Sequence, residues 1–458
     1  MKLLIRSGRV IDPANGRDEI ADILVGDGSI ASIGSGLPES GAEVVDADGM
    51  IVSPGFIDLH VHLREPGEEY KETIASGAAA AVAGGFAAIC AMPNTRPVND
   101  NASITRYVID KGREAGFARV HPVGAITRAS AGEELAEMTD MKEAGAVAVS
   151  DDGRPVMNSQ VMRHAMEYAR EHGLVVVDHC QDTSLSAGGV MHEGRYSTLL
   201  GLKGMSAAAE ESHIARDIML ARLTGARVHI AHISTASAVA MVRAAKAEDL
   251  PITCEVTPHH LALTDEAVQG FDTNTKMSPP LRSERDRAAL IEAAADGTID
   301  AIATDHAPHH QDEKMLEYDR APFGVIGLET ALGVALGIFY HGHTGSEASP
   351  NTRAHPTGSV GSQHIGTSAA ALLPTRLPLS RIIEMLTIGP ARAFGVSGGT
   401  LAIGSSADIT IFDPDLEWRV DPIRFKSKSR NTPFTGWHLK GRPIATFVGG
   451  RPVFTHGG

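Results

Sequence analysis

Cysteine is scarce in this chain of 458 residues, which contains only Cys90, Cys180 and Cys254. Their wide spacing matches neither a disulfide framework nor a four-cysteine zinc site. Long apolar runs are also missing, since no segment approaches the roughly 18 uninterrupted apolar residues of a membrane span. We therefore expect a soluble protein in a reducing, cytoplasmic setting, with no membrane as its partner.

Positive charge is in short supply as well. The formal net charge is −15 at pH 7, and no cluster of Lys and Arg stands out along the sequence. Nucleic-acid surfaces require such clusters, so no nucleic-acid partner is expected. An anionic ligand would need a local positive site, which metal ions and a few arginines could supply. Aromatic residues make up 4% of the chain, whereas its 48 glycines suit an α/β enzyme with many tight turns.

From Gly55 onward, short apolar segments alternate with Ala-rich helical stretches. This alternation predicts a closed parallel (β/α)8 barrel of the TIM type, because each strand and helix forms one repeating unit. A doubly wound open sheet is the alternative, but no GxGxxG turn is present to support it. The expected strands are Phe56–Val61, Phe86–Ala91, Arg119–Ala125, Ala146–Ser150, Leu174–Asp178, Arg227–Ala231, Ile252–Val256 and Ile299–Ala303.

The two ends of the chain share a different texture of short strands and Gly or Asp turns. Because chain ends commonly lie close together, residues 1–52 and 396–458 are predicted to form one composite β-sandwich domain. The barrel, residues 53–395, would be inserted between its halves. Residues 342–367 are polar and rich in Gly, Ser, Thr and Pro, and we interpret them as a surface loop insertion whose role the sequence leaves open.

Metal-ligand side chains follow most of the predicted barrel strands. Chemistry in parallel barrels collects at the carboxyl ends of the strands, so these side chains should meet at one mouth. In the first strand, alternation places Asp58, His60 and His62 on the same side. The polar residues at the strand ends are His60, His62, Arg64, Asn94, Asp151, Asp152, His179, His232, His259, His260, Asp305, His306 and His309. Imidazoles and carboxylates dominate this set, which favours a metal site over chance.

Four imidazoles and two carboxylates can bind two divalent ions if one carboxylate bridges them. Such a set would comprise His60, His62, His179, His232, Asp305 and one aspartate of the SDDG turn, Asp151 or Asp152, between which spacing does not choose. Metal-bound water becomes hydroxide near pH 7, and Asp305 is placed to take its proton and pass it to a leaving nitrogen. This constellation suits the hydrolysis or formation of a cyclic amide.

The chain resembles the amidohydrolase superfamily and, within it, the class I dihydroorotases. The resemblance is carried by PGFIDLHVHLREPG, MPNT, SDDGRPV, DHC, HIAHIS, EVTPHHL, KMSPPLRS, ATDHAPH, PFGVIGLE and KSKSRNTPFTGWHLKGRP, which span nearly the whole chain. It implies reversible cyclisation of N-carbamoyl-L-aspartate to (S)-dihydroorotate and water, a step of de novo pyrimidine biosynthesis. It also implies zinc, with one or two ions per chain, and a small-molecule substrate.

The resemblance also implies a role for each site residue. His60 and His62 would bind the first metal, His179 and His232 the second, while Asp152 bridges them. Asp305 would be both a ligand and the catalytic acid/base. Substrate contacts would come from His62, Arg64, Asn94, Ser278, His309, Phe323 and Gly324. Ser278 replaces the asparagine usual in the family, and Asn274 nearby is the other candidate for its role.

Two alternatives stay open. Hydantoinases and allantoinases share the barrel but bridge their metals with a carboxylated lysine after the fourth strand, where this chain has AVAVSDDG. A non-catalytic subunit that scaffolds aspartate transcarbamoylase is the other, although this chain retains a residue at every ligand position. A homo-oligomer is expected, and an aspartate transcarbamoylase is a possible partner.

Overall fold

The computed structural model describes residues 2–343 and 376–457. Most of the predicted insertion at 342–367, including His355 and His364, lies outside the described residues. Within the described part of the chain, no helix is long and apolar enough to cross a membrane.

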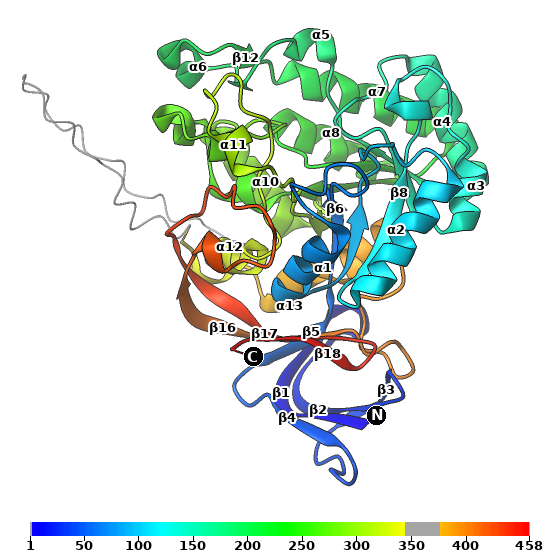
Figure 1. Ribbon diagram of the computed structural model, residues 1–458, viewed down its shortest axis with the longest axis vertical. Helices are drawn as coiled ribbons and strands as arrows, with labels where there is room; N and C mark the ends of the chain where they lie inside the picture. Colours follow the sequence, from blue (N-terminus) through cyan, green and yellow to red (C-terminus); the bar gives the residue numbers. More distant parts are fainter. Residues whose placement is uncertain (1, 344–375, 458) are drawn as a thin grey trace, which may run out of the picture.

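Eight parallel strands form the larger body of the molecule, and every predicted barrel segment contains one of them (Figure 1). In chain order they are β6 (Phe56–Val61), β7 (Phe86–Ala91), β8 (Arg119–Gly124), β9 (Ala148–Ser150), β10 (Val175–Asp178), β13 (Val228–Ile230), β14 (Ile252–Val256) and β15 (Ala301–Ile302). Each pairs with its neighbour in this order. A bridge between Val61 and His306 brings the first and last strands together, so the barrel is nearly closed.

Helices cover the outside of the barrel (Figure 1). The main ones are α1 (Ile74–Ala83), α2 (Ala102–Ala115), α3 (Met138–Ala144), α4 (Ser159–Glu171), α7 (Ala208–Thr224), α8 (Ala236–Ala247), α10 (Glu284–Asp296), α12 (Ala331–Leu336), α13 (Leu379–Leu386) and α14 (Ile388–Phe394). Several begin at a capping side chain, such as Thr73 before α1 and Ser283 before α10, which satisfies backbone N–H groups of the first turn. Short helices α5 (Thr183–Ser186), α6 (Arg195–Leu200), α9 (Pro258–Ala262) and α11 (Gln311–Lys314), with the strand pair β11 (Met191–His192) and β12 (Gly204–Met205), lie in the connecting segments.

Both chain ends contribute to a second, mixed sheet. Its strands are β1 (Lys2–Asp12), β2 (Arg17–Gly26), β3 (Ser29–Gly34), β4 (Glu43–Asp46), β5 (Ile51–Pro54), β16 (Ile409–Arg419), β17 (His438–Val448) and β18 (Arg451–Thr455). The order is β18-β17-β16-β5-β1-β2-β3, with β4 paired to β1. The predicted fold class, a barrel with an extra sheet built from both chain ends, is therefore confirmed. The domain limits drawn from the sequence stay a prediction.

The composite sheet adjoins the end of the barrel where β6 begins. Strand β5 runs almost directly into β6, and Phe56 packs against Phe86 of the barrel and Phe412 of the sheet at ring distances of 5.7 and 6.0 Å. These contacts join the two bodies through apolar side chains. The carboxyl ends of the barrel strands consequently lie at the opposite mouth, away from the sheet.

Candidate active site

The pleat of β6 delivers Asp58, His60 and His62 to the inside of the barrel, as alternation predicts, and all three side chains are buried. His62 Nε2 lies 3.0 Å from Asp305 Oδ1, and His60 Nε2 lies 3.6 Å from the same oxygen. Ligand atoms of these three residues are all within 4.8 Å of one another. The first and last strands thus place two imidazoles and one carboxylate around a common point.

A second group of ligand atoms adjoins the first. His60, Asp152 and His232 also form a set whose atoms lie within 4.8 Å of one another. His179 Nδ1 is 2.9 Å from His232 Nε2 and 3.5 Å from Asp152 Oδ1. All six ligands expected from the sequence therefore meet at this mouth, with Asp152 facing both groups.

The structure distinguishes the two aspartates of the SDDG turn. Asp151 accepts hydrogen bonds from the backbone N–H groups of Ile126 and Thr127 at 2.8 and 3.1 Å, and from the Thr127 hydroxyl. Its carboxylate is therefore engaged with the loop after β8. Asp152 instead lies 3.3 Å from His60 Nε2, and this geometry makes it the candidate bridge.

Buried polar side chains orient the histidines, and two of these side chains were not predicted from the sequence. Glu255 of β14 accepts from His60 Nδ1 at 2.8 Å, and Gln181 Oε1 lies 2.8 Å from His179 Nε2. The signal for Glu255 was an ionisable residue inside an otherwise apolar strand. Asp58 accepts from the His60 backbone N–H and from the Thr304 hydroxyl at 2.6 Å, which ties β6 to the residues before Asp305. Such partners fix ring orientation and the nitrogen left for a metal.

The histidines of the cluster lower the pKa values of its two carboxylates. Burial alone would raise the pKa of Asp152, but the neighbouring His60, His179 and His232 imidazoles hold it well below its usual value. The pKa of Asp305 is likewise lowered, against the effect of burial, by His60 and His62. Both carboxylates are thus poised as anions that attract positive charge.

The cluster fits divalent metal ions. His60 Nε2 is fully buried among these ligands and has no hydrogen-bond partner, a costly state for a ring nitrogen unless a cation accepts its lone pair. His232 and Asp305 are non-glycine residues with positive φ, at 30° and 46°. Backbone strain of this kind concentrates at functional sites, where side-chain direction matters more than local stability.

Beside the cluster lies a small cavity of about 170 Å³. Its lining includes every substrate-binding residue expected from the resemblance, namely His62, Arg64, Asn94, Ser278, His309, Phe323 and Gly324. Arg64 Nε donates to the Pro308 carbonyl at 3.1 Å, and Asn94 Oδ1 lies 2.9 Å from His62 Nδ1. Ser278 Oγ donates to Gln181 Oε1 at 3.1 Å, whereas Asn274 is absent from the described lining.

Three further residues hold the loops of this cavity, and sequence reasoning missed them. Asn431 Nδ2 donates to the carbonyls of Ala307 and Gly324 at 3.0 and 3.1 Å, while its Oδ1 accepts from the His309 N–H. Lys314 Nζ donates to the carbonyls of Pro322 and Gly324, both at 3.0 Å. Lys276 Nζ donates to the Asp319 carbonyl and lies over the Phe323 ring. Asn431 belongs to the KSKSRN motif, and this motif was the feature of the sequence that could have indicated its role.

The remaining histidines support the site from outside the ligand set. His260 contacts the Thr257 hydroxyl at 2.7 Å and the Pro279 carbonyl at 3.0 Å. Burial lowers the pKa of His259 to about 4, so this imidazole is neutral. His306 Nδ1 accepts from the Gly327 N–H, and its Nε2 lies 3.4 Å from Glu72.

A nearly closed parallel barrel carrying four histidines and two aspartates at one mouth defines a protein of the amidohydrolase type. Two family models agree: one described as dihydro-orotase-like matches residues 49–238, and the amidohydrolase family matches residues 349–454. Solved structures of similar fold include an L-hydantoinase from Arthrobacter aurescens, with TM-score 0.83 and 24% identity over 100% of this chain and 96% of that one. A dihydropyrimidinase from Brevibacillus agri gives TM-score 0.79 and 21% identity over 99% and 95%.

Curated relatives are much more similar in sequence. A dihydroorotase of Pelotomaculum thermopropionicum is 54% identical over 99% of this chain and 98% of its own length. Dihydroorotases of Solibacter usitatus and an Anaeromyxobacter species are 50% and 52% identical, again over at least 97% of both proteins. The chain belongs to the dihydroorotase family of the amidohydrolase superfamily.

Proposed function

We propose that this protein is a dihydroorotase, which interconverts N-carbamoyl-L-aspartate and (S)-dihydroorotate with release or uptake of water. The observation that carries the proposal is one cavity in which a guanidinium, Arg64, lies beside the Asp152 and Asp305 cluster. Its volume of about 170 Å³ suits a small molecule. Family membership and relatives about 50% identical over nearly the whole chain support the same activity.

Arg64 is the proposed partner of the substrate carboxylate. Its Nε donates to the Pro308 carbonyl and its Nη2 lies 3.4 Å from His309 Nε2, so the guanidinium is held in place at the cavity wall. Burial and the positive charges of Arg64, Lys314 and Lys71 lower the pKa of His309 to about 2, so this imidazole is neutral beside the guanidinium. His309 Nε2 donates to the Phe323 carbonyl at 2.7 Å, which positions the loop whose backbone groups would contact the ring amide. A guanidinium recognises a carboxylate through two parallel hydrogen bonds.

Chemistry at the ring amide centres on Asp305. Divalent ions held by His60, His62, Asp152, His179, His232 and Asp305 would lower the pKa of a coordinated water to about 7 and polarise the amide carbonyl. Asp305 lines the cavity as an anion, so a carboxylate oxygen can take a proton during hydrolysis and deliver it to the departing ring nitrogen. In the direction of cyclisation, the same carboxylate removes the proton from the carbamoyl nitrogen.

A hydantoinase-type activity is the competing function. Those enzymes use a carboxylated lysine after the fourth strand, but here β9 ends at Ser150 and is followed by Asp151 and Asp152. Among the described residues that line the cavity, none is a lysine. An aspartate in place of that lysine, with Asp152 as the proposed bridge, supports the assignment as a dihydroorotase.

The proposal is tested with the metal-loaded, full-length protein. We expect turnover of dihydroorotate and carbamoyl aspartate, and at least a hundredfold lower kcat/KM for hydantoin and allantoin. Asp305→Ala should lower kcat by about 10²-fold or more, since general acid/base catalysis contributes about 10² to 10⁴. A folded, metal-loaded protein that is active on hydantoin but not on dihydroorotate would refute the assignment, and so would full activity in Asp305→Ala. A scaffold without catalysis would show no turnover in either protein.

The finer features of the assignment belong to the same proposal. Zinc is the proposed ion, because imidazole and carboxylate ligands in a compact set suit it. We also propose a homo-oligomer, a cytoplasmic location and partnership with an aspartate transcarbamoylase. Metal analysis of the purified protein and its mass in solution, with and without a transcarbamoylase, test these points directly.

A further inference from the structure

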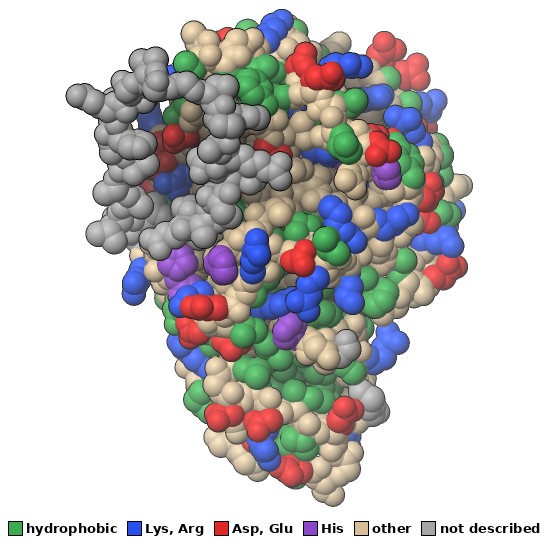
Figure 2. Space-filling model, turned by 60° about the vertical axis from the view of Figure 1, so that its left-hand side comes forward, with side chains coloured by type: hydrophobic (Ala, Val, Ile, Leu, Met, Phe, Trp, Pro, Cys, Tyr) green, Lys and Arg blue, Asp and Glu red, His purple; other side chains and the backbone are tan. Residues whose placement is uncertain are grey.

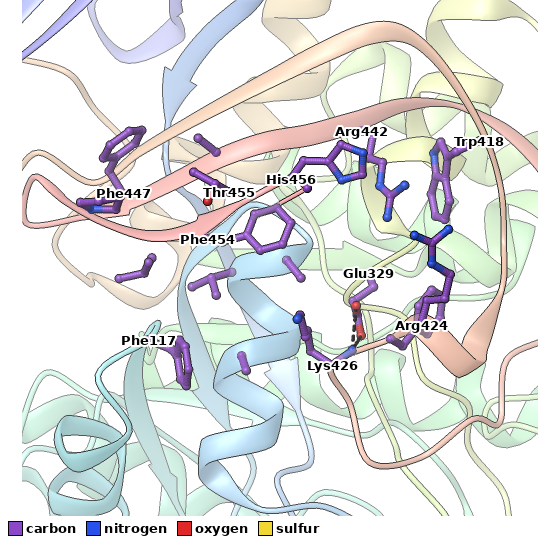
Figure 3. A pocket seen from close by; sticks show the side chains of 18 of the residues that line it. Phe117, Glu329, Trp418, Arg424, Lys426, Arg442, Phe447, Phe454, Thr455 and His456 are labelled. Carbon is purple, nitrogen blue, oxygen red and sulfur yellow. Dashed lines mark hydrogen bonds between the residues drawn. The ribbon is translucent and has the colours of Figure 1, made fainter. Parts of the chain in front are cut away.

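A second and much larger cavity, of about 920 Å³, lies between the composite sheet and the barrel (Figure 3). Its walls come from α1, β16, β17 and β18 and from the segment 421–426. None of its described lining residues belongs to the active-site cavity. Ligand sites commonly have volumes of about 300–1,000 Å³, so the space is large enough for an organic metabolite.

One end of this cavity is basic. Arg424, Lys426 and Arg442 surround it, and Arg442 stacks on the Trp418 ring at 4.8 Å (Figure 3). None of these three cationic groups makes an ion pair or side-chain hydrogen bond with another described residue. On the face shown in Figure 2, several Lys and Arg side chains lie between the barrel and the sheet, with some Asp and Glu side chains among them. Because the chain has a net charge of −15, such a local gathering of cations is notable.

Among the described residues, the acidic side chains of the lining form no ion pair with Arg424, Lys426 or Arg442. Glu329 accepts hydrogen bonds from the backbone N–H groups of Lys426 and Ser427 at 2.9 and 3.2 Å. Burial raises the pKa of Glu329 to about 7, so its negative charge is partly lost near neutrality. Asp421 accepts from the Ile423 N–H at 3.2 Å, and Glu43 belongs to the exposed strand β4.

The other end of the cavity is apolar. Its lining includes Phe447 and Phe454 from the sheet and Val82 from α1. Phe117 lies farther along the wall (Figure 3). A ligand that fills the whole space must therefore combine an anionic group with a flat or apolar body. Planar rings stack well on aromatic side chains, and phosphate is recognised by guanidinium and ammonium groups.

We propose that this cavity binds an organic phosphate with an aromatic ring, of the nucleoside monophosphate class. The phosphate lies among Arg424, Lys426 and Arg442 at the basic end, and the ring system packs against Phe454 at the apolar end. The site is separate from the catalytic mouth, so it takes its ligand independently of the substrate.

Calorimetric titration of the full-length, metal-loaded protein with AMP tests the proposal, with adenosine and inorganic phosphate as its two halves. AMP should bind at least about tenfold more tightly than either half, a difference of about 1.4 kcal/mol. Arg424→Ala and Lys426→Ala should each weaken AMP binding about tenfold, since each removes one charge-assisted contact. Both side chains are exposed, so these variants should keep the thermal stability and dihydroorotate turnover of the wild type.

Two controls locate the binding event. Arg106→Ala removes an exposed arginine of α2 outside the cavity and should leave AMP affinity unchanged. Arg64→Lys alters the catalytic mouth and should also leave it unchanged. The proposal is overturned if AMP shows no binding at millimolar concentration, if neither Arg424→Ala nor Lys426→Ala weakens it, if phosphate alone binds as tightly, or if Arg64→Lys abolishes binding.

Discussion

Asp151 and Asp152 are adjacent in the chain, yet their carboxylates have different partners. Asp152 lies among His60, His179 and His232, whereas Asp151 caps the loop at Ile126 and Thr127. Adjacent side chains of a turn point in different directions, so the sequence alone could narrow the bridge to this pair but could not choose between them.

This difference predicts contrasting variants. Asp152→Asn should lose metal and lower kcat/KM by about 10²-fold or more, because an amide is a poor bridging ligand. Asp151→Asn should keep its metal and stay within a few-fold of wild-type activity, while losing about 1–2 kcal/mol of stability from weakened backbone contacts. Metal content per chain and urea unfolding distinguish the two. Equal metal loss in both variants would contradict the assignment.

Lys314 gives a prediction about pH. Burial, with a contribution from Lys276, lowers the pKa of Lys314 from 10.5 to about 7. Between these two pKa values the unfolded chain binds more protons than the folded one, so this group makes stability rise as pH increases from about 7 to 10.5. Below pH 7 it is protonated in both states, and its contribution is constant.

Lys314→Met should remove this titration. The melting temperature of the wild type should therefore rise relative to that of the variant between pH 7 and 10. At every pH the variant should also be less stable, because it lacks the hydrogen bonds to the Pro322 and Gly324 carbonyls. Calorimetric scans at several pH values measure the difference. Lys246→Met, which also removes a lysine with hydrogen bonds and an ion pair to Asp300, is the control for a general lysine effect. Parallel pH profiles for wild type and Lys314→Met would disprove the prediction.

At the scale of elements, the segment 427–431 links the composite sheet to the catalytic mouth. Ser427 Oγ donates to Glu72, and Asn431 bridges the loops carrying His309 and Gly324. The segment lies more than a hundred residues after those loops, and its position depends on how β16 and β17 fold back. The local pattern of apolar residues carries no information about such contacts. Only the KSKSRN motif indicated that this segment belongs to the site.

Asn431→Ala should loosen the substrate loops without touching the metal ligands. We expect KM for dihydroorotate to rise about tenfold with a smaller change in kcat, since one buried side chain with three hydrogen bonds is lost. Ser429→Ala is the matched control. Ser429 lies in the same segment as Asn431, but its hydroxyl donates to the Lys71 carbonyl and to neither substrate loop. Steady-state kinetics on metal-loaded protein separate KM from kcat. A KM increase of equal size in Ser429→Ala would show that the effect is general loosening.

Strands were easier to predict from the sequence than the supporting contacts. Apolar runs bounded by turns marked all eight barrel strands, and β15 (Ala301–Ile302) lies inside the predicted Ile299–Ala303. The convergence of the candidate ligands could be predicted because these residues lie at or just after strand ends, where the barrel fixes their position. Gln181 and Glu255 were missed because their roles depend on side-chain direction across neighbouring strands, which hydrophobic pattern does not encode.

For the whole molecule, metal removal should lower stability as well as activity. Without cations, His60 Nε2 has no hydrogen-bond partner, and two buried carboxylates lie within 4 Å of several imidazoles. A metal present at about a thousand times its dissociation constant stabilises the folded state by about 4 kcal/mol, because it binds the folded site and not the unfolded chain. Chelation should therefore lower the melting temperature by several degrees, and added zinc should restore it together with dihydroorotate turnover. The Asp152→Asn protein should show no comparable response to zinc. If chelated wild-type protein keeps its melting temperature while its metal is demonstrably gone, the cluster does not hold a stabilising ion.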